Sequence, residues 1–156
     1  MEDDVTILLD REAIKEITAK YCMCLDTKNI DGLRKLFHKD IVLAFGDQDV
    51  QRGIEKAITF LEEKFKIYKF LVHFIHNHII EIKGNEAKGT CYLESYMEKN
   101  GEELICTGFY DDRYLKEEGN WLLTLRKFNV FYFVPLREGW AGKEKGSIKT
   151  VLESKS

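Results

Sequence analysis

Three of the four histidines lie close together in one apolar segment, and their side chains could do proton chemistry. His73, His76 and His78 belong to the longest run of β-branched and aromatic residues, 70–82. Imidazole takes up and releases protons near physiological pH, so a strand that points one histidine into a cavity places a general acid or base there. Because side chains alternate along a strand, we expect His73 to face the cavity and the other two to face an outer or subunit surface.

A helix that precedes this strand offers a second reactive group, the phenol of Tyr21. Asp10 is a suitable N-cap, so the helix is predicted to begin there, with residues 1–9 as a short arm. Its apolar stripe recurs at helical spacing: Ile14, Ile17, Tyr21 and Cys24. The helix therefore turns the Tyr21 hydroxyl toward the core.

The remaining segments predict how these groups are positioned. Two further helices, at 31–37 and 53–66, flank a strand at 41–45 that returns through a short hairpin. Four strand-like runs follow, joined by short turns that demand antiparallel neighbours: 70–82, 87–98, 102–116 and 120–133. This order predicts an α+β fold, a cone-shaped α+β barrel in which a strongly bent antiparallel sheet wraps around the N-terminal helices and keeps an apolar cavity.

Length and composition predict one domain. The chain has 156 residues, of which 44% are hydrophobic and 12% aromatic, enough to enclose a core and a pocket. Pro135 ends the last strand, so we expect a single domain over residues 1–140 and a polar, partly ordered tail over 141–156. No run of about 18 apolar residues is present, and no membrane span is expected.

Charge and cysteine content exclude several function classes. The net charge of −3 provides no cationic field for nucleic acid or an anionic membrane. The cysteines include a C-x-C pair, Cys22 and Cys24, within a helical pattern, and we recognise no secretion signal. We therefore expect reduced thiols in a cytoplasmic protein. The cysteines lack the C-x-x-C spacing that is typical of zinc sites, and neither a metal nor a cofactor is expected.

Several short segments, in this order along the chain, resemble a known family. They are 12–17, 20–26, the strand with His73-Phe74-Ile75, Trp121, and 131–136. Together they resemble the SnoaL-like branch of the nuclear-transport-factor-2-like superfamily over roughly residues 10–140. Within it, the chain is most similar to the scytalone dehydratases, bile-acid 7-alpha-dehydratases and hexachlorocyclohexane dehydrochlorinases.

The resemblance implies a catalytic pair and a polarising tyrosine. In those lyases a strand histidine in the place of His73 acts as general base, and an aspartate in the place of Asp26 pairs with it. Tyr21 matches the helix tyrosine with which the dehydratases bind a substrate carbonyl or hydroxyl. The implied activity is a cofactor-independent elimination or isomerisation on a small apolar cyclic ketone or alcohol. The resemblance also implies a homo-oligomer, a trimer or a dimer.

The chain departs from these lyases in the residues that recognise substrate. A second tyrosine of the dehydratases corresponds to Phe45, which has no hydroxyl. An arginine of the last strand falls near Val130, with Arg126 and Lys127 as the closest cations. Leu71 stands where the dehydrochlorinases have a cysteine, which argues against dehydrochlorination.

The predicted pair has a physical rationale of its own. A carboxylate that binds one ring nitrogen fixes the tautomer and stabilises the imidazolium, a general-base effect of about 10²–10⁴-fold. A phenol such as Tyr21 can stabilise the developing enolate. Glu94 is a candidate second acid. We expect the substrate pocket to be lined by Phe45, Phe60, Ile75, Glu94, Phe109 and Phe128.

Each assignment has a structural alternative. The pair of His73 and Asp26 could serve only to stabilise the fold, and Tyr21 could be a core aromatic. His76 and His78 could bind a metal, although an interface role fits them better. The alternatives to a lyase are therefore a non-catalytic ligand-binding or scaffolding domain of the same fold, and a polyketide or steroid-like cyclase or ketosteroid-type isomerase.

Overall fold

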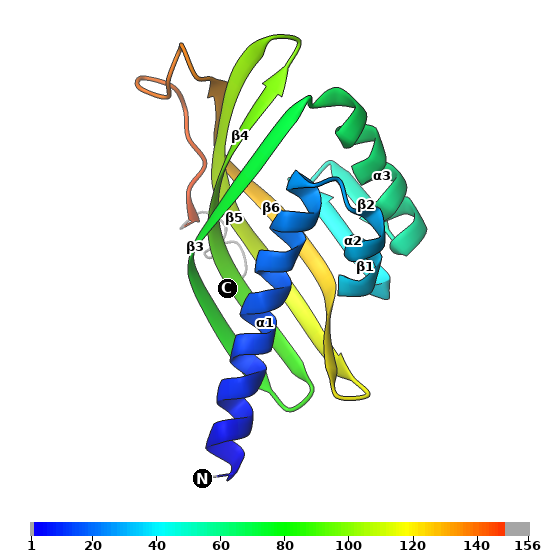
Figure 1. Ribbon diagram of the computed structural model, residues 1–156. Helices are drawn as coiled ribbons and strands as arrows, with labels where there is room; N and C mark the ends of the chain where they lie inside the picture. Colours follow the sequence, from blue (N-terminus) through cyan, green and yellow to red (C-terminus); the bar gives the residue numbers. More distant parts are fainter. Residues whose placement is uncertain (1, 149–156) are drawn as a thin grey trace.

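The computed structural model describes residues 2–148 and contains three helices and six strands (Figure 1). The helices are α1 (Glu2–Asp26), α2 (Ile30–Leu36) and α3 (Ile54–Ile67). The strands are β1 (Phe37–Phe45), β2 (Asp49–Arg52), β3 (Phe70–Lys83), β4 (Glu86–Lys99), β5 (Glu102–Glu117) and β6 (Asn120–Pro135). The four long strands predicted from residue 70 onward are confirmed, with ends that differ by one or two residues.

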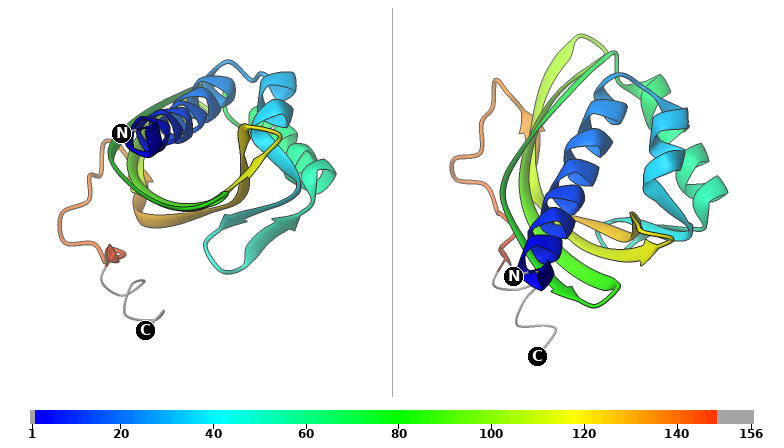
Figure 2. Two further views of the ribbon diagram at one scale, coloured as in Figure 1. Left: turned by 90° about the horizontal axis from the view of Figure 1, so that it is seen from below. Right: turned by 60° about the horizontal axis from the view of Figure 1, so that its bottom comes forward.

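All six strands form one sheet in the order β2-β1-β6-β5-β4-β3. The sheet is open, with β2 and β3 at its edges, and bends around α1 (Figure 2). This arrangement confirms the predicted α+β fold. The sheet is mixed rather than purely antiparallel, because β1 lies parallel to β6. The β1–β2 hairpin and α3 separate β1 from the later strands in the sequence. The last strand, β6, can therefore lie beside β1 and run in the same direction.

Helix α1 begins at Glu2, so the predicted start at Asp10 is wrong. The Asp10 carboxylate does not cap the helix. It accepts hydrogen bonds from Lys116 Nζ at 2.7 Å and from Trp121 Nε1 at 2.9 Å, which join α1 to β5 and β6. Arg11 donates to the carbonyl of Ile80 in β3 at 2.7 Å. Contacts to three strands thus hold the helix on the sheet.

A β-bulge in β3 changes the direction of one predicted histidine. The pairing with β4 shifts between His76 and Ile79, and Asn77 has a φ of 45°, in the left-handed region that asparagine tolerates. The extra residue reverses the alternation, and His78 turns inward over Gly89, where a Cβ would come within 3.0 Å of its Nε2. The expectation that His78 faces outward with His76 is therefore wrong.

The segment after β6 follows the outer side of the sheet, away from α1 (Figure 2). The backbone N–H of Gly146 donates to the carbonyl of Phe131, and the Trp140 ring stacks on Tyr132 with a centroid distance of 5.2 Å. Of the predicted tail 141–156, residues 149–156 lie outside the described residues. The described part contacts the body of the fold.

Candidate active site

The end of α1 meets the edge strand β3 at a histidine–carboxylate pair. Asp26, the last residue of α1, places Oδ1 2.5 Å from Nδ1 of His73. Its other oxygen, Oδ2, accepts a hydrogen bond from the backbone N–H of His73 at 3.1 Å. That N–H lies on the sheet edge, where no further strand uses it. Two contacts therefore fix the carboxylate relative to the imidazole.

This geometry selects one form of the imidazole. When Nδ1–H donates to Asp26, the other ring nitrogen, Nε2, carries a free lone pair and can accept a proton. The side chains of His73 and Asp26 are 10% and 22% exposed. The carboxylate stabilises the imidazolium that forms when Nε2 is protonated, so the pair can work as a general base and then as a general acid.

His73 lies in the wall of a cavity of about 220 Å³, between α3 and the inner face of β3 to β6. Apolar side chains form most of the lining, so a bound molecule would be largely removed from water. The lining residues are Leu25, Phe45, Leu61, Lys64, Phe65, Tyr68, Leu71, His73, Leu93, Ser95, Met97, Cys106, Tyr110, Phe128, Val130 and Phe133.

Of the predicted pocket residues, Phe45 and Phe128 line this cavity. Phe60 packs behind Phe45, with ring centroids 5.1 Å apart. Phe109 faces the other side of the sheet, where it contacts other aromatic rings, because β5 turns its neighbour Tyr110 inward.

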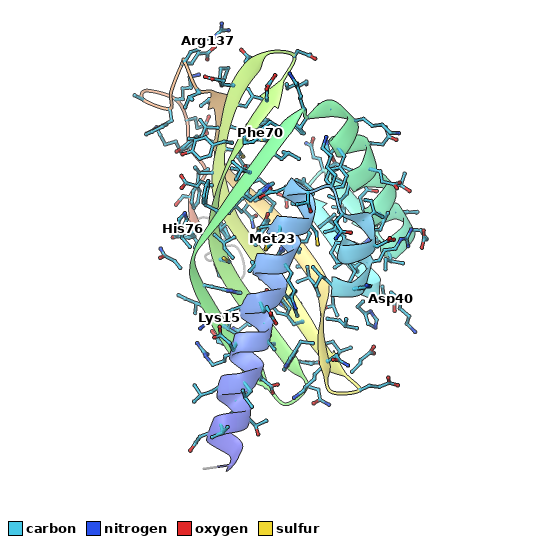
Figure 3. The ribbon with its side chains drawn as sticks, viewed as in Figure 1. Lys15, Met23, Asp40, Phe70, His76 and Arg137 are labelled. Carbon is cyan, nitrogen blue, oxygen red and sulfur yellow. The ribbon has the colours of Figure 1, made fainter. Side chains whose placement is uncertain are left out.

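Two other predicted pocket residues also lie away from the cavity lining. Ile75 packs against the hydrophobic core. Glu94 lies on the outer face of β4, 3.4 Å from Nε2 of His76. Figure 3 shows His76 on the side of β3 away from α1. His76 and Glu94 thus form a second histidine–carboxylate pair, an exposed one.

Tyr21, the predicted polarising donor, does not line the cavity. Its ring is fully buried and contacts the Tyr110 ring edge-on, with centroids 5.9 Å apart. Its hydroxyl is buried and has no hydrogen-bond partner among residues 2–148, and burial raises the pKa of this phenol. Tyr21 lies on a different side of α1 from Asp26. Its position is that of a core aromatic residue, which was the structural alternative to a catalytic role.

A sealed ion pair lies beneath Tyr21 and Tyr110. The Arg126 guanidinium, 4.3 Å and 4.0 Å from these two ring centroids, donates from Nη2 to Oδ2 of Asp112 at 2.6 Å and from Nε to Oδ1 at 2.9 Å. Burial lowers the pKa of Arg126, but the Asp112 carboxylate outweighs this and the net shift is upward. Val130, not a cation, lines the cavity.

Sequence reasoning missed four polar residues of the cavity lining. They are Lys64, Tyr68, Ser95 and Tyr110. Ser95 shares the face of His73 because the two residues pair directly, but this pairing depends on the register shift between His76 and Ile79, so the sequence alone does not indicate it. Tyr110 requires knowledge of the pairing between β4 and β5, which the sequence alone does not specify.

Among residues 2–148, no group of three or more histidine, cysteine, aspartate or glutamate side chains could hold a metal ion. All four cysteines are free thiols, as predicted. No described helix is both long enough and apolar enough to cross a membrane.

Residues 6–127 match the family model of the SnoaL-like domain. The chain belongs to the SnoaL-like family. The match spans α1, the histidine–carboxylate pair and most of the sheet, which confirms the resemblance inferred from the short segments.

Solved structures share the SnoaL-like architecture at low sequence identity. A hexachlorocyclohexane dehydrochlorinase from Novosphingobium barchaimii is 17% identical, with a TM-score of 0.80 over 92% of this chain and 99% of that one. A protein from Novosphingobium aromaticivorans, assigned provisionally as a scytalone dehydratase, is 20% identical, with a TM-score of 0.80 over 95% and 97%. A protein of unknown function from Nostoc punctiforme is 25% identical, with a TM-score of 0.69 over 78% and 91%.

Proposed function

We propose that the protein is a cofactor-independent lyase or isomerase that acts on a small, largely apolar cyclic ketone or alcohol. The observation that carries the proposal is the contact between His73 and Asp26 in the wall of an apolar cavity. An oriented base whose second nitrogen is free, in a cavity with a mostly apolar lining, is suited to proton abstraction from carbon.

The proposed elimination uses one base for two proton transfers. His73 Nε2 removes a proton from the carbon next to the substrate carbonyl, and the electron pair moves onto the carbonyl oxygen. Asp26 stabilises the resulting imidazolium. The enolate then collapses, the bond to the β-hydroxyl breaks, and the imidazolium returns its proton to the departing oxygen. The products are a conjugated ketone and water, and the base is regenerated.

The comparisons support a reaction of this class. One similar structure is a dehydrochlorinase and another is assigned provisionally as a scytalone dehydratase, so each is associated with loss of a small molecule from a ring. Leu71, which lines the cavity, replaces a residue characteristic of the dehydrochlorinases, so we favour loss of water over loss of chloride. An isomerase or cyclase would use the same first step without losing water.

A binding domain without turnover is the second candidate. Phe45 and Val130 line the cavity where the related enzymes carry polar side chains. A cavity with few polar groups can hold an apolar ligand while it lacks the contacts that select a transition state.

The test compares the two histidine–carboxylate pairs of β3. We expect His73→Ala and Asp26→Asn to lower the turnover of β-hydroxy cyclic ketones by about 10²–10⁴-fold, because each removes general-base catalysis. His76→Ala and Glu94→Gln are the matched controls on the exposed pair, and they should retain turnover within about twofold. Product formation and exchange of the α-proton in D₂O are both measured, since exchange without water loss identifies an isomerase.

Three outcomes separate the candidates. Unchanged turnover in both His73→Ala and Asp26→Asn would remove the catalytic assignment. A parent protein that binds these ketones but neither exchanges nor eliminates would favour the binding domain. Equal losses in the His76→Ala control would show that the effect comes from the strand as a whole rather than from the pair in the cavity.

A further inference from the structure

Ser95 is a buried polar residue that neither the fold nor the proposed proton transfers require. It lies in β4, is 3% exposed, lines the cavity, and pairs directly with His73 across the two strands. No hydrogen bond joins its hydroxyl to another side chain or backbone group of residues 2–148. The Ser95 hydroxyl is therefore free to donate to a molecule that enters the cavity, and that hydrogen bond would favour binding.

The surroundings of Ser95 leave the cavity as the source of that partner. Leu93 and Met97, two residues to either side on the same face of β4, are apolar, and Cys106 is its cross-strand neighbour in β5. The thiol of Cys106 is protonated because burial raises its pKa to about 12, and a thiol is a weak acceptor. Among these neighbours only His73 is strongly polar.

We propose that Ser95 donates a hydrogen bond to an oxygen of the bound molecule, beside His73. The cavity would then select molecules with an apolar ring that carries a carbonyl or hydroxyl oxygen on the carbon next to the one that faces the imidazole. This inference rests on the proposed function, because it names the donor that proton abstraction next to a carbonyl needs. Negative charge develops on that oxygen as the proton leaves, and the Ser95 hydroxyl stabilises it.

Position favours Ser95 over the other cavity hydroxyls for this role. Tyr110 pairs with Cys91, which lies four residues from Ser95 along β4, or about 13 Å. The backbone of Tyr110 therefore lies away from the pair of His73 and Ser95. Tyr68 follows α3, so it comes from the helix side of the wall and not from the strand pair that carries His73. A donor and a base that touch adjacent atoms of one small ring must lie side by side, as Ser95 and His73 do.

The experiment measures binding and so does not depend on turnover. Affinities for tetralone and for tetralin, the same ring system without the oxygen, are determined for the parent and for Ser95→Ala by calorimetry. We expect the parent to prefer tetralone by about tenfold and Ser95→Ala to lose that preference, while its affinity for tetralin stays within about twofold. Ser95→Ala removes no internal hydrogen bond, so its thermal stability should equal that of the parent.

Two control variants locate the donor. Thr90→Val removes a hydroxyl from the opposite face of β4 and should leave the preference unchanged. Tyr110→Phe should do the same. The proposal is overturned if the parent shows no preference for the ketone, if Ser95→Ala keeps it, or if Tyr110→Phe alone abolishes it. A preference that depends on Ser95 in a protein without turnover contradicts the proposed function only.

Discussion

Two polar clusters lie between the helix α1 and the sheet, and they differ in what their charges can still do. In one, the Asp112 carboxylate binds Arg126 through both oxygens, and the side chains are 0% and 1% exposed. In the other, Asp26 binds only one nitrogen of His73 and the backbone, and the pair borders a cavity. The first cluster is sealed and the second is open.

The difference shows that a buried charge pair is not by itself a sign of function. Asp112 also accepts a hydrogen bond from the Tyr114 hydroxyl at 2.7 Å, and Thr18 accepts one from Arg126 at 3.1 Å, so the sealed cluster joins α1, β5 and β6 in the core. His73 keeps Nε2 uncommitted and within reach of a cavity occupant. An unused donor or acceptor that borders a cavity separates a site from a support, since Nη1 of Arg126 also has no partner among residues 2–148 but Arg126 does not line the cavity.

Breaking the sealed cluster should have the largest effect on stability. Asp112→Asn leaves the Arg126 charge buried without a counterion, and we expect the free energy of unfolding to fall by about 3–5 kcal/mol. Glu94→Gln, in the exposed pair, should change it by less than about 0.5 kcal/mol. Urea unfolding followed by circular dichroism measures both. A loss below about 1 kcal/mol for Asp112→Asn would mean that water reaches Arg126 and that the cluster is not sealed.

His78 provides a pH probe of the same region. Burial lowers the pKa of His78, Asp112 opposes this shift, and the cations Arg126, Lys15 and Arg11 add to it. The unfolded chain therefore binds a proton near pH 6.5, before the folded protein does, so stability is fully present above that pH and is lost as pH falls below it.

The expected result is a steeper pH dependence in the parent than in His78→Gln. The difference in slope should reach at most about 1.4 kcal/mol per pH unit below pH 6.5, and the two curves should run parallel above it. Urea unfolding between about pH 5 and pH 8 gives both curves. Parallel curves throughout this range would show that His78 is protonated equally in the folded and unfolded protein.

The two clusters also show where sequence reasoning succeeded. The alternation of β3 up to His76 is regular, so the inward direction of His73 could be predicted. The bulge at Asn77 could not be predicted, because it depends on how β4 pairs with β3, and it turns His78 from the outer to the inner face of the sheet. The partner Asp26 came from the resemblance, since no sequence spacing relates the end of a helix to a strand 47 residues away.

Helical periodicity correctly predicted that Tyr21 faces inward, but it does not predict whether the side chain reaches the cavity. The stripe turned the ring inward as predicted. Which inward surface it meets depends on the tilt of α1 across the sheet, and contacts such as that of Arg11 with Ile80 fix this tilt only in three dimensions. The ring consequently covers the buried Arg126. Ser95 could not be predicted as a cavity residue, because a lone serine forms no pattern in the sequence.

Tyr21→Phe should have the smallest effect, and it tests whether the two polar clusters are separate. The Tyr21 hydroxyl is buried without a partner in the described part of the chain, so Tyr21→Phe removes an unsatisfied group and keeps the ring that contacts Arg126. We expect the free energy of unfolding to rise by up to about 1 kcal/mol, and ligand affinity and turnover to stay the same. If Tyr21→Phe lowers turnover as His73→Ala does, then the phenol reaches the cavity during the reaction, and the two clusters are one continuous site.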